Sequence, residues 1–306
     1  MKRVVLNLCG IKSKGGINIA KDFIKNNDHL SLFIIFDNEE FYEFIEKYEK
    51  KFINIPRYLH PFLSLFISKA TRKKINEHDL IIHFGNFGFK SKIKSLTFIQ
   101  NILPLVTPFS SFRNLFLRIL YKFSFSISDE IIVQQKHVAE LISSSKTKII
   151  GNIIYKKIKQ NNVGGFVVII EDNINKNPNF LIRVVDKLIE LNFKVTVINT
   201  SKFTISNKAK VVISPSHEEL LEVFNKNQTY IHASDYETVG LPIYEALNSG
   251  LKVVVPKKDY ISIENPNIYK YKIGDIESII QACLDSANKK SEFEEVPIYF
   301  EDWKLT

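Results

Sequence analysis

Glu237 and Glu245 are the residues whose type and spacing point most clearly to chemistry. Seven residues separate them, and the intervening stretch contains the turn Gly240-Leu241-Pro242. A carboxylate accepts hydrogen bonds from sugar hydroxyls. Proline suits the first turn of a helix, where its missing N–H is not needed, and glycine lets a ligand approach the backbone closely. The pattern predicts a loop that carries Glu237 and a short helix that carries Glu245.

The start of that helix is a predicted anion site. The first backbone N–H groups of a helix have no partner within it, so we expect the amides of Gly240 and Leu241 to point outward. That end also carries a partial positive charge, which suits a phosphate. A simpler interpretation is an acidic residue that only stabilises the helix dipole. We favour the anion site because the whole pattern lies between two apolar stretches, 229–231 and 253–255.

This stretch resembles the signature of the retaining glycosyltransferases of the GT-B fold, in family 4, over about residues 229–256. The resemblance implies that Glu237 contacts the donor sugar, Glu245 the nucleotide ribose, and the amides of Gly240 and Leu241 the diphosphate. It also implies that no metal ion and no cofactor is needed. The family has no well-placed enzymic nucleophile, so the leaving phosphate itself would take the acceptor proton.

A lysine in the loop 173–178 matches a second feature of the resembled enzymes. They place an arginine about five residues before a lysine, and both contact the donor diphosphate. Lys176 matches that lysine, whereas Glu171 stands near the place of the arginine. A cation beside a leaving pyrophosphate neutralises developing charge. Three explanations stay open: Lys176 suffices, another lysine such as Lys202 moves in, or the donor is bound unusually. A solvated loop lysine is the simpler alternative.

The N-terminal half contributes two glycines and two amides. A strand at 4–8, a loop at 10–16 and a helix at 17–26 make a common ligand-binding start of an α/β sheet, although the dinucleotide fingerprint is absent. In the resembled family a Gly-Gly loop here faces the donor, so Gly15 and Gly16 are candidate donor-binding residues. Many relatives contact the transferred sugar through a histidine at a later strand end. Gln100 and Asn101 stand there and are candidate catalytic residues.

Other polar residues follow the same two strands, which we expect at 80–84 and 96–99. Ligands bind at the carboxyl ends of parallel strands, so His83 and Asn86 are expected near Gln100. His83 is a substitute for the missing family histidine in one interpretation. In the other it is structural, as a strand-end histidine more often is.

The net charge of +9 suits an acidic ligand, an anionic membrane surface or nucleic acid, or it only maintains solubility. The lysines are dispersed and no recognition module is visible, so nucleic acid is not an expected partner. Helices predicted at 61–74 and 108–125 combine aromatic and basic residues. Such helices lie in membrane interfaces or form core helices with a solvated basic stripe. Our hypothesis is that this half contacts the anionic cytoplasmic leaflet.

Cysteine usage and hydropathy indicate where in the cell the protein is located. Cys9 and Cys283 match no metal or redox spacing, which fits a reduced cytosolic setting. No apolar run approaches the ~20 residues that span a bilayer, and the N-terminus is typical of a first strand rather than a signal peptide. We predict a cytoplasmic protein with peripheral contact to the inner face of the cell membrane.

Strands and helices alternate through both halves, which predicts α/β architecture of the GT-B type. We expect two Rossmann-like, doubly wound parallel-sheet domains, an acceptor-binding domain at 1–157 and a nucleotide-sugar-binding domain at 158–306. Ligands would lie in an interdomain cleft. Residues 39–51 are expected to form a charged helix and 52–55 a short strand.

The leading function is transfer of a sugar, with retention, from a nucleotide-diphosphate donor to a saccharide acceptor. The apolar, basic first domain fits a lipid-linked acceptor, as in bacterial lipopolysaccharide or capsule synthesis. A degenerate sugar-nucleotide-binding scaffold is the first alternative, favoured by the missing arginine and by the end of the sequence soon after Trp303. A nucleotide-sugar epimerase of the same fold is the second, although its additional catalytic residues are not found. The donor base and sugar stay open.

Overall fold

The computed structural model describes residues 2–107, 112–150, 164–200, 203–261 and 263–290. The chain divides into two compact units on either side of the segment 151–163. Unit 1 denotes the described residues up to 150, and unit 2 those from 164 to 290. The expected boundary at 157/158, and the last residues of the expected second domain, lie outside the described residues.

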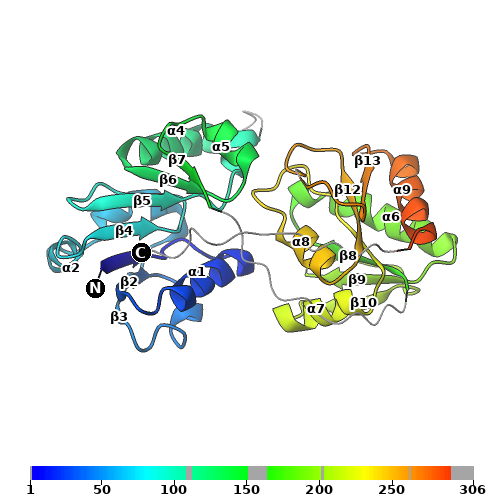
Figure 1. Cartoon of the computed structure of the whole chain (residues 1–306), viewed down its shortest axis with the longest axis horizontal. Coiled ribbons are helices and arrows are strands. Elements are labelled where there is room, and N and C mark those ends of the chain that lie inside the picture. Colours follow the sequence, from blue (N-terminus) through cyan, green and yellow to red (C-terminus); the bar gives the residue numbers. More distant parts are fainter. Residues whose placement is uncertain (1, 108–111, 151–163, 201–202, 262, 291–306) are drawn as a thin grey trace. The chain divides into compact units, whose positions relative to one another are not determined.

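Unit 1 is a seven-stranded sheet whose strands are all parallel, with helices on its faces (Figure 1). The strand order is β3-β2-β1-β4-β5-β6-β7. The strands are β1 Arg3–Asn7, β2 Ser31–Phe36, β3 Glu49–Phe52, β4 Leu80–His83, β5 Lys94–Phe98, β6 Glu130–Val133 and β7 Thr147–Ile149. The α-helices are α1 Lys14–Asn26, α2 Lys69–Ile75, α3 Leu103–Val106, α4 Phe112–Ile127 and α5 Lys136–Ile142, and the 3₁₀ helices are η1 Glu39–Phe41 and η2 Arg57–Leu65.

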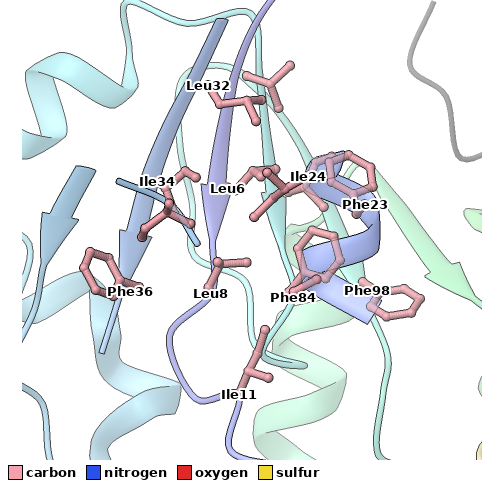
Figure 2. Packing of buried hydrophobic residues seen from close by; sticks show 14 of the residues in the cluster. Leu6, Leu8, Ile11, Phe23, Ile24, Leu32, Ile34, Phe36, Phe84 and Phe98 are labelled. Carbon is pink, nitrogen blue, oxygen red and sulfur yellow. The ribbon is translucent and has the colours of Figure 1, made fainter. Parts of the chain in front are cut away.

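The core of unit 1 lies on both faces of the sheet, because successive residues of a strand point to opposite faces. On one face, Phe23 and Ile24 of α1 pack on side chains such as Leu6 (Figure 2). On the other face, Val5 and Ile81 pack with residues from the η2 and α2 region. This double burial explains the near-continuous apolar runs of β1, β2 and β4.

Two helices differ from the sequence expectation. Residues 39–51 form only the short η1 and then β3, whose backbone pairs with β2 in parallel register. Pairing at the sheet edge satisfies backbone groups that a solvated helix would satisfy alone, so tertiary context overrides the local helical pattern. The expected helix at 61–74 is interrupted, because Ser68 begins α2 by accepting a hydrogen bond from the Thr71 N–H.

Helix α1 also begins earlier than expected. Ser13 is its N-cap and accepts a hydrogen bond from the Gly16 N–H at 3.1 Å. Gly15 and Gly16 therefore lie in the first turn of α1 and not in the preceding loop.

Unit 2 repeats the arrangement with a six-stranded parallel sheet of order β10-β9-β8-β11-β12-β13 (Figure 1). Its strands are β8 Phe166–Ile170, β9 Val195–Asn199, β10 Lys210–Ile213, β11 Thr229–Ile231, β12 Lys252–Pro256 and β13 Ile268–Tyr271. Its helices are the 3₁₀ helix η3 Ile174–Lys176 and α6 Pro178–Glu190, α7 His217–Asn225, α8 Leu241–Asn248 and α9 Ile276–Asn288.

Both sheets are doubly wound. The chain order reverses between β1 and β4 in unit 1 and between β8 and β11 in unit 2. In open α/β sheets, ligands bind beyond the carboxyl ends of the strands at this switch point. The loops after β8 and β11 are those that carry Lys176 and Glu237. Within the described residues, no helix combines the length and apolarity needed to cross a membrane.

Candidate functional site

Helix α8 has the ends that the sequence predicts. Gly240 occupies its N-cap with a left-handed φ of 76°. At the other end Gly250, with φ 74°, donates its N–H to the Leu247 carbonyl at 2.8 Å, and Leu251 donates to Ala246 at 2.9 Å. This pair of bonds is the Schellman motif. Two glycines in left-handed conformations thus fix where the helix begins and ends.

The beginning of α8 has free donors. Among the hydrogen bonds of the described residues, none uses the backbone N–H of Gly240 or Leu241. Gly240 is buried and Leu241 half-buried, and a Cβ at Gly240 would lie 3.1 Å from the Ile243 Cδ1 and 3.7 Å from the Glu237 Cγ. Unpaired amides and the helix dipole at this end suit an anion, and the anion site itself stays a prediction.

Two asparagines join the loop after β8 to the loop after β11. The Asn175 side chain donates to the Tyr236 carbonyl at 2.8 Å and accepts from the Tyr236 N–H at 3.0 Å. The Asn177 side chain donates to the Ala233 carbonyl at 2.8 Å. Lys176 lies between the two asparagines, so these bonds hold it next to the loop that carries Glu237.

Lys176 and Glu237 form an ion pair at the centre of the site. The Lys176 Nζ lies 2.5 Å from the Glu237 Oε1, and the side chains are 23% and 13% exposed. The His232 Nε2 lies 3.4 Å from the same oxygen, a distance of electrostatic contact rather than of an ordinary hydrogen bond. Burial alone would raise the pKa of Glu237, but Lys176 and His232 hold that pKa well below its usual value. Glu237 is therefore a carboxylate.

His232 is buried behind the ion pair. Burial lowers the pKa of its imidazole, although the nearby Glu237 opposes that effect. The Tyr230 hydroxyl lies 3.0 Å from the His232 Nδ1, and burial followed by the charge of Glu237 raises the pKa of Tyr230. A neutral imidazole that accepts at Nδ1 from Tyr230 carries its hydrogen on Nε2, toward Glu237.

These groups border a pocket at the carboxyl ends of β8 and β11, called here the unit 2 pocket. Its lining includes Glu171, Lys176, His232, Ser234 and Pro242. Within the described part of the chain, no hydrogen bond or ion pair engages the Glu171 carboxylate. The pocket and the adjoining Glu237 therefore combine two carboxylates with one ammonium group.

Glu245 has a partner that the sequence interpretation missed. The His217 Nε2 lies 2.9 Å from the Glu245 Oε1, and the glutamate side chain is 11% exposed. His217 is the first residue of α7, whose N-cap Ser216 forms a capping box with Glu219. The capping sequence is recognisable before a structure is known, but the contact of His217 with a residue 28 positions away is not.

In unit 1 the structure brings together two of the predicted residues. Gln100 covers Gly16 so closely that a Cβ there would clash with the Gln100 Oε1. The Asn86 Oδ1 accepts the backbone N–H groups of Gln100 and Asn101 at 2.6 and 2.9 Å. Gln100 is half-buried, whereas Asn101 is exposed and caps the Leu103 N–H at 3.0 Å.

His83 is a core residue. It is fully buried, its Nδ1 lies 3.0 Å from the Asn7 side-chain amide, and its ring packs edge-on against Phe89. Burial lowers its pKa to about 3. The structural interpretation of this strand-end histidine therefore fits better than a sugar contact.

The remaining expectations concern an alternative lysine, a metal ion and the two cysteines. Lys202, an alternative cation, lies outside the described residues. No three His, Cys, Asp or Glu side chains of the described ranges gather in a way that could hold a metal ion, and metal independence stays a prediction. Both cysteines are free and buried.

Comparisons with known proteins bear on the fold. No protein-family model and no curated protein matches the sequence. Solved structures do match: Anabaena HepE in complex with UDP and glucose has 16% identity and a TM-score of 0.69 over 94% of this chain and 91% of that chain. Sucrose-phosphate synthase from Thermosynechococcus elongatus has 11% identity and a TM-score of 0.70, over 93% and 89%.

A third neighbour is the lipopolysaccharide outer core galactosyltransferase WaaB, with 12% identity and a TM-score of 0.65 over 96% of this chain and 92% of that chain. At such identities the likeness concerns the fold. It confirms the expected class, two parallel-sheet α/β units of the GT-B glycosyltransferase type. The family number and the role of the two glutamates stay predictions, as does a cleft between the units.

Proposed function

We propose that this protein is a glycosyltransferase that moves a sugar from a nucleotide-diphosphate donor to an acceptor hydroxyl. The observation that carries the proposal is the start of α8, where the free amides of Gly240 and Leu241 lie beside the Lys176–Glu237 pair. HepE, a structural neighbour, has been solved with UDP-glucose. Uridine nucleotides are therefore the first probes to use.

The ion pair gives each partner a second role once the donor binds. The diphosphate would bind at the amides of Gly240 and Leu241 and draw the Lys176 ammonium away from Glu237. Glu237 would then be free to accept a hydrogen bond from a hydroxyl of the donor sugar. Lys176 would neutralise charge that develops on the leaving diphosphate. Glu245, oriented by His217, would accept hydrogen bonds from the ribose hydroxyls.

The reaction balances without a further reactant. The bond between the sugar C1 and the diphosphate oxygen breaks, and a bond from C1 to the acceptor oxygen forms. The acceptor proton passes to the leaving phosphate, and the nucleoside diphosphate departs. Retention at C1 is proposed because the family resemblance implies it and because the leaving phosphate then acts on the face that the acceptor attacks.

Nucleotide binding by Glu245 is tested by thermal unfolding with UDP. We expect UDP to raise the melting temperature of the native protein and to leave that of Glu245→Ala unchanged, because the ribose contact is lost. Glu277→Ala is the matched control, since Glu277 is an acidic residue in the first turn of α9. A normal UDP shift in Glu245→Ala would remove Glu245 from the site.

Turnover separates the enzyme from the scaffold alternative. Incubation with UDP-glucose and a panel of other nucleotide sugars should release the nucleoside diphosphate slowly, by hydrolysis or by transfer. Glu237→Gln should retain nucleotide binding and lose roughly a hundredfold or more in turnover, a loss typical of a single electrostatic contact to the transition state. Binding of UDP with no turnover of any donor would favour a sugar-nucleotide-binding scaffold.

The proposal includes a lipid-linked acceptor, supported by an apolar surface on unit 1. Two elements contribute six exposed large apolar side chains: Leu65, Phe66, Leu115, Phe116, Ile119 and Phe123. The rings of Phe62 and Phe116 lie 6.4 Å apart, so η2 and α4 adjoin here. Exposed apolar side chains gathered on two adjoining elements are typical of an interaction site. We call these six residues the apolar patch.

Charge favours an anionic membrane as the partner of the apolar patch. Residues 57–75 and 112–127 contain no aspartate or glutamate, and Lys69, Arg72, Lys73 and Lys122 are exposed. Basic groups beside exposed aromatic side chains are the composition of interfacial segments, and each contributes about 1 kcal/mol near an anionic surface. The protein would then act on the inner face of the cell membrane.

Sedimentation with phosphatidylglycerol vesicles tests this contact, with phosphatidylcholine vesicles as the charge control. Leu65→Ser should bind the anionic vesicles roughly tenfold more weakly, because burying a leucine contributes about 1.5 kcal/mol. Ile213→Ser is the matched control: Leu65 is 79% and Ile213 78% exposed, but Ile213 lies in unit 2. Equal sedimentation of both variants would show that the apolar patch does not contact the vesicles.

A further inference from the structure

A carboxylate–imidazole pair lies at the carboxyl edge of the unit 1 sheet, formed by two residues to which no role is assigned above. Asp37 directly follows β2, and His60 belongs to η2. The Asp37 Oδ2 lies 2.6 Å from the His60 Nε2. The Asp37 side chain is 2% exposed and the His60 side chain 9%. A nearly buried pair at the ligand-binding edge of an α/β sheet requires an explanation.

The hydrogen bonds of Asp37 fix the tautomer of His60. The Asp37 Oδ1 accepts the Gly10 N–H at 2.9 Å, so both carboxylate oxygens act as acceptors. The imidazole then directs an Nε2 hydrogen to Asp37, which leaves Nδ1 as the ring nitrogen that can meet a ligand hydroxyl. Asp37 is thus anchored by the backbone and holds the ring in one orientation.

The Nδ1 of His60 is accessible. It makes no hydrogen bond within the described part of the chain, and it is not among the unpartnered polar atoms that are sealed from solvent. It points toward Gly10, where an added Cβ would lie 3.3 Å away. Gly10 has φ 90°, a conformation that side chains rarely adopt. Glycine at this position therefore leaves the face of the ring uncovered.

The pair is one end of a row of polar groups along the edge. Gly10 adjoins Gly85 of the loop after β4, and the next residue, Asn86, positions the backbone of Gln100. Gln100 in turn covers Gly16 at the start of α1. The Gln100 Nε2 is sealed from solvent, and the Asn86 Oδ1 is occupied by two backbone N–H groups, so His60 is the member of the row that can meet a sugar hydroxyl.

We propose that His60 binds a hydroxyl of a saccharide acceptor through Nδ1, with Asp37 as the residue that positions the ring. The inference rests on the proposed function and assigns its acceptor site. His60 does not take the proton, which leaves with the diphosphate as described above. It holds the acceptor so that the reacting oxygen is oriented.

The other histidines of unit 1 with described contacts differ in this respect. His83 is sealed in the core. The His78 Nδ1 bonds the Lys74 carbonyl at 2.8 Å, and His78 precedes β4, at the opposite edge of the sheet. His78 is therefore a matched control for substitutions at His60.

The test distinguishes a His60 that binds a sugar hydroxyl from a His60 that only stabilises the local structure. In His60→Gln the amide nitrogen can still donate to Asp37, but nothing replaces Nδ1. Saturation-transfer NMR on the full chain would measure binding of methyl glucoside, methyl galactoside and N-acetylglucosamine. We expect the native protein and His78→Gln to bind at least one of these sugars, and His60→Gln to bind it roughly tenfold more weakly, the effect of one lost hydrogen bond.

A second measurement checks the positioning role. In Asp37→Asn the anchor of the ring changes, so the imidazole ¹⁵N shifts of His60 should no longer show a single Nε2–H tautomer, and sugar binding should weaken as in His60→Gln. The UDP melting shift should be normal in all these variants, because it reports unit 2. Native-like sugar binding by His60→Gln, or no sugar binding by the native protein, overturns the inference. Loss of the UDP shift in the native protein would instead reject the proposed function.

Discussion

The two units repeat one parallel strand order, but the polar groups at their carboxyl edges differ. Unit 2 places charge against charge, with Lys176 on Glu237. Unit 1 relies mainly on neutral hydrogen bonds, as between His83 and Asn7, and its buried Asp37 is shared between a backbone amide and an imidazole. On the functions proposed above, the same scaffold would bind an ionic ligand in one unit and a hydroxyl-bearing ligand in the other.

The difference has an energetic consequence. Charges removed from water are costly unless they are paired, and removing one partner leaves the other uncompensated. The edge of unit 2 therefore depends on its ion pair in the absence of ligand. The neutral contacts of unit 1, such as that of His83 with Asn7, are less sensitive to a single loss, and Asp37 is the exception. Four predictions test or refine this contrast, and hydrogen exchange can follow the two units separately.

The largest expected effect is that of Lys176→Met. It leaves the carboxylate of Glu237 buried beside His232, and we expect unit 2 to lose about 3 kcal/mol of unfolding free energy. Peptides of unit 2 should exchange faster, while those of unit 1 keep their rates. The double variant Lys176→Met/Glu237→Gln should recover most of the loss, because no charge is left unpaired. A double variant as unstable as the single one would contradict the ion-pair explanation.

The second-largest effect is expected from acid, which should lower the stability of unit 1 more than that of unit 2. The pKa of His83 is about 3 in the folded protein and about 6.5 in an unfolded chain. Between these values only the unfolded chain binds the proton, so stability falls as pH decreases from 6.5. The loss is about 2 kcal/mol at pH 5. His232 should contribute less, because Glu237 opposes the fall of its pKa.

His83→Asn should flatten the pH dependence of unit 1 exchange, since the variant has no group that titrates there. His78→Asn, at a partly exposed position, is the control and should keep the native slope. If His83→Asn and the native protein lose protection in parallel between pH 6.5 and 5, the buried histidine is not the cause.

A smaller effect is expected for Gly240→Ala. The left-handed φ of 76° should cost about 1–2 kcal/mol for any residue with a side chain. Gly274→Ala is the control, because Gly274 has φ 77° and open space around it. Gly240→Ala should lose somewhat more stability than Gly274→Ala in thermal unfolding, because its Cβ would lie 3.1 Å from the Ile243 Cδ1. Only Gly240→Ala should weaken the UDP shift, since its Cβ would lie at the proposed anion site.

Glu171→Gln should have the smallest effect, and a favourable one. The Glu171 carboxylate lines the unit 2 pocket and should repel a diphosphate. Removing its charge should strengthen UDP binding roughly fivefold, as expected for about 1 kcal/mol between two charges about 4 Å apart in water. Calorimetric titration with UDP measures this, with the exposed neighbour Asp172→Asn as the control. Weaker binding by Glu171→Gln would show that this carboxylate contacts the nucleotide favourably.

Residues close in sequence account for what could be predicted. The two glycines and the proline of α8 fix its bounds through their own backbone preferences, and the alternation of strands with helices indicated two parallel sheets. The helix expected at 39–51 was wrong because β3 gains its hydrogen bonds from β2, which no local pattern reveals.

The partners of the site residues depend on long-range contacts. Lys176 and Glu237 are 61 positions apart, and His217 meets Glu245 across 28. The sequence identified three of these four residues individually, because each fits a motif. It did not identify His60 or His217 as contributors, since an isolated histidine in a helix has no distinctive neighbours.

By itself the sequence determined the secondary structure around Glu237 and Glu245, because the conformations of Gly240, Pro242 and Gly250 are properties of single residues. It also determined the fold class through the spacing of apolar strands. Only the tertiary structure decided which charged side chains form ion pairs, which histidines are buried in the core, and that the Nδ1 of His60 is accessible. Those outcomes depend on how parallel strands from distant parts of the chain align their ends.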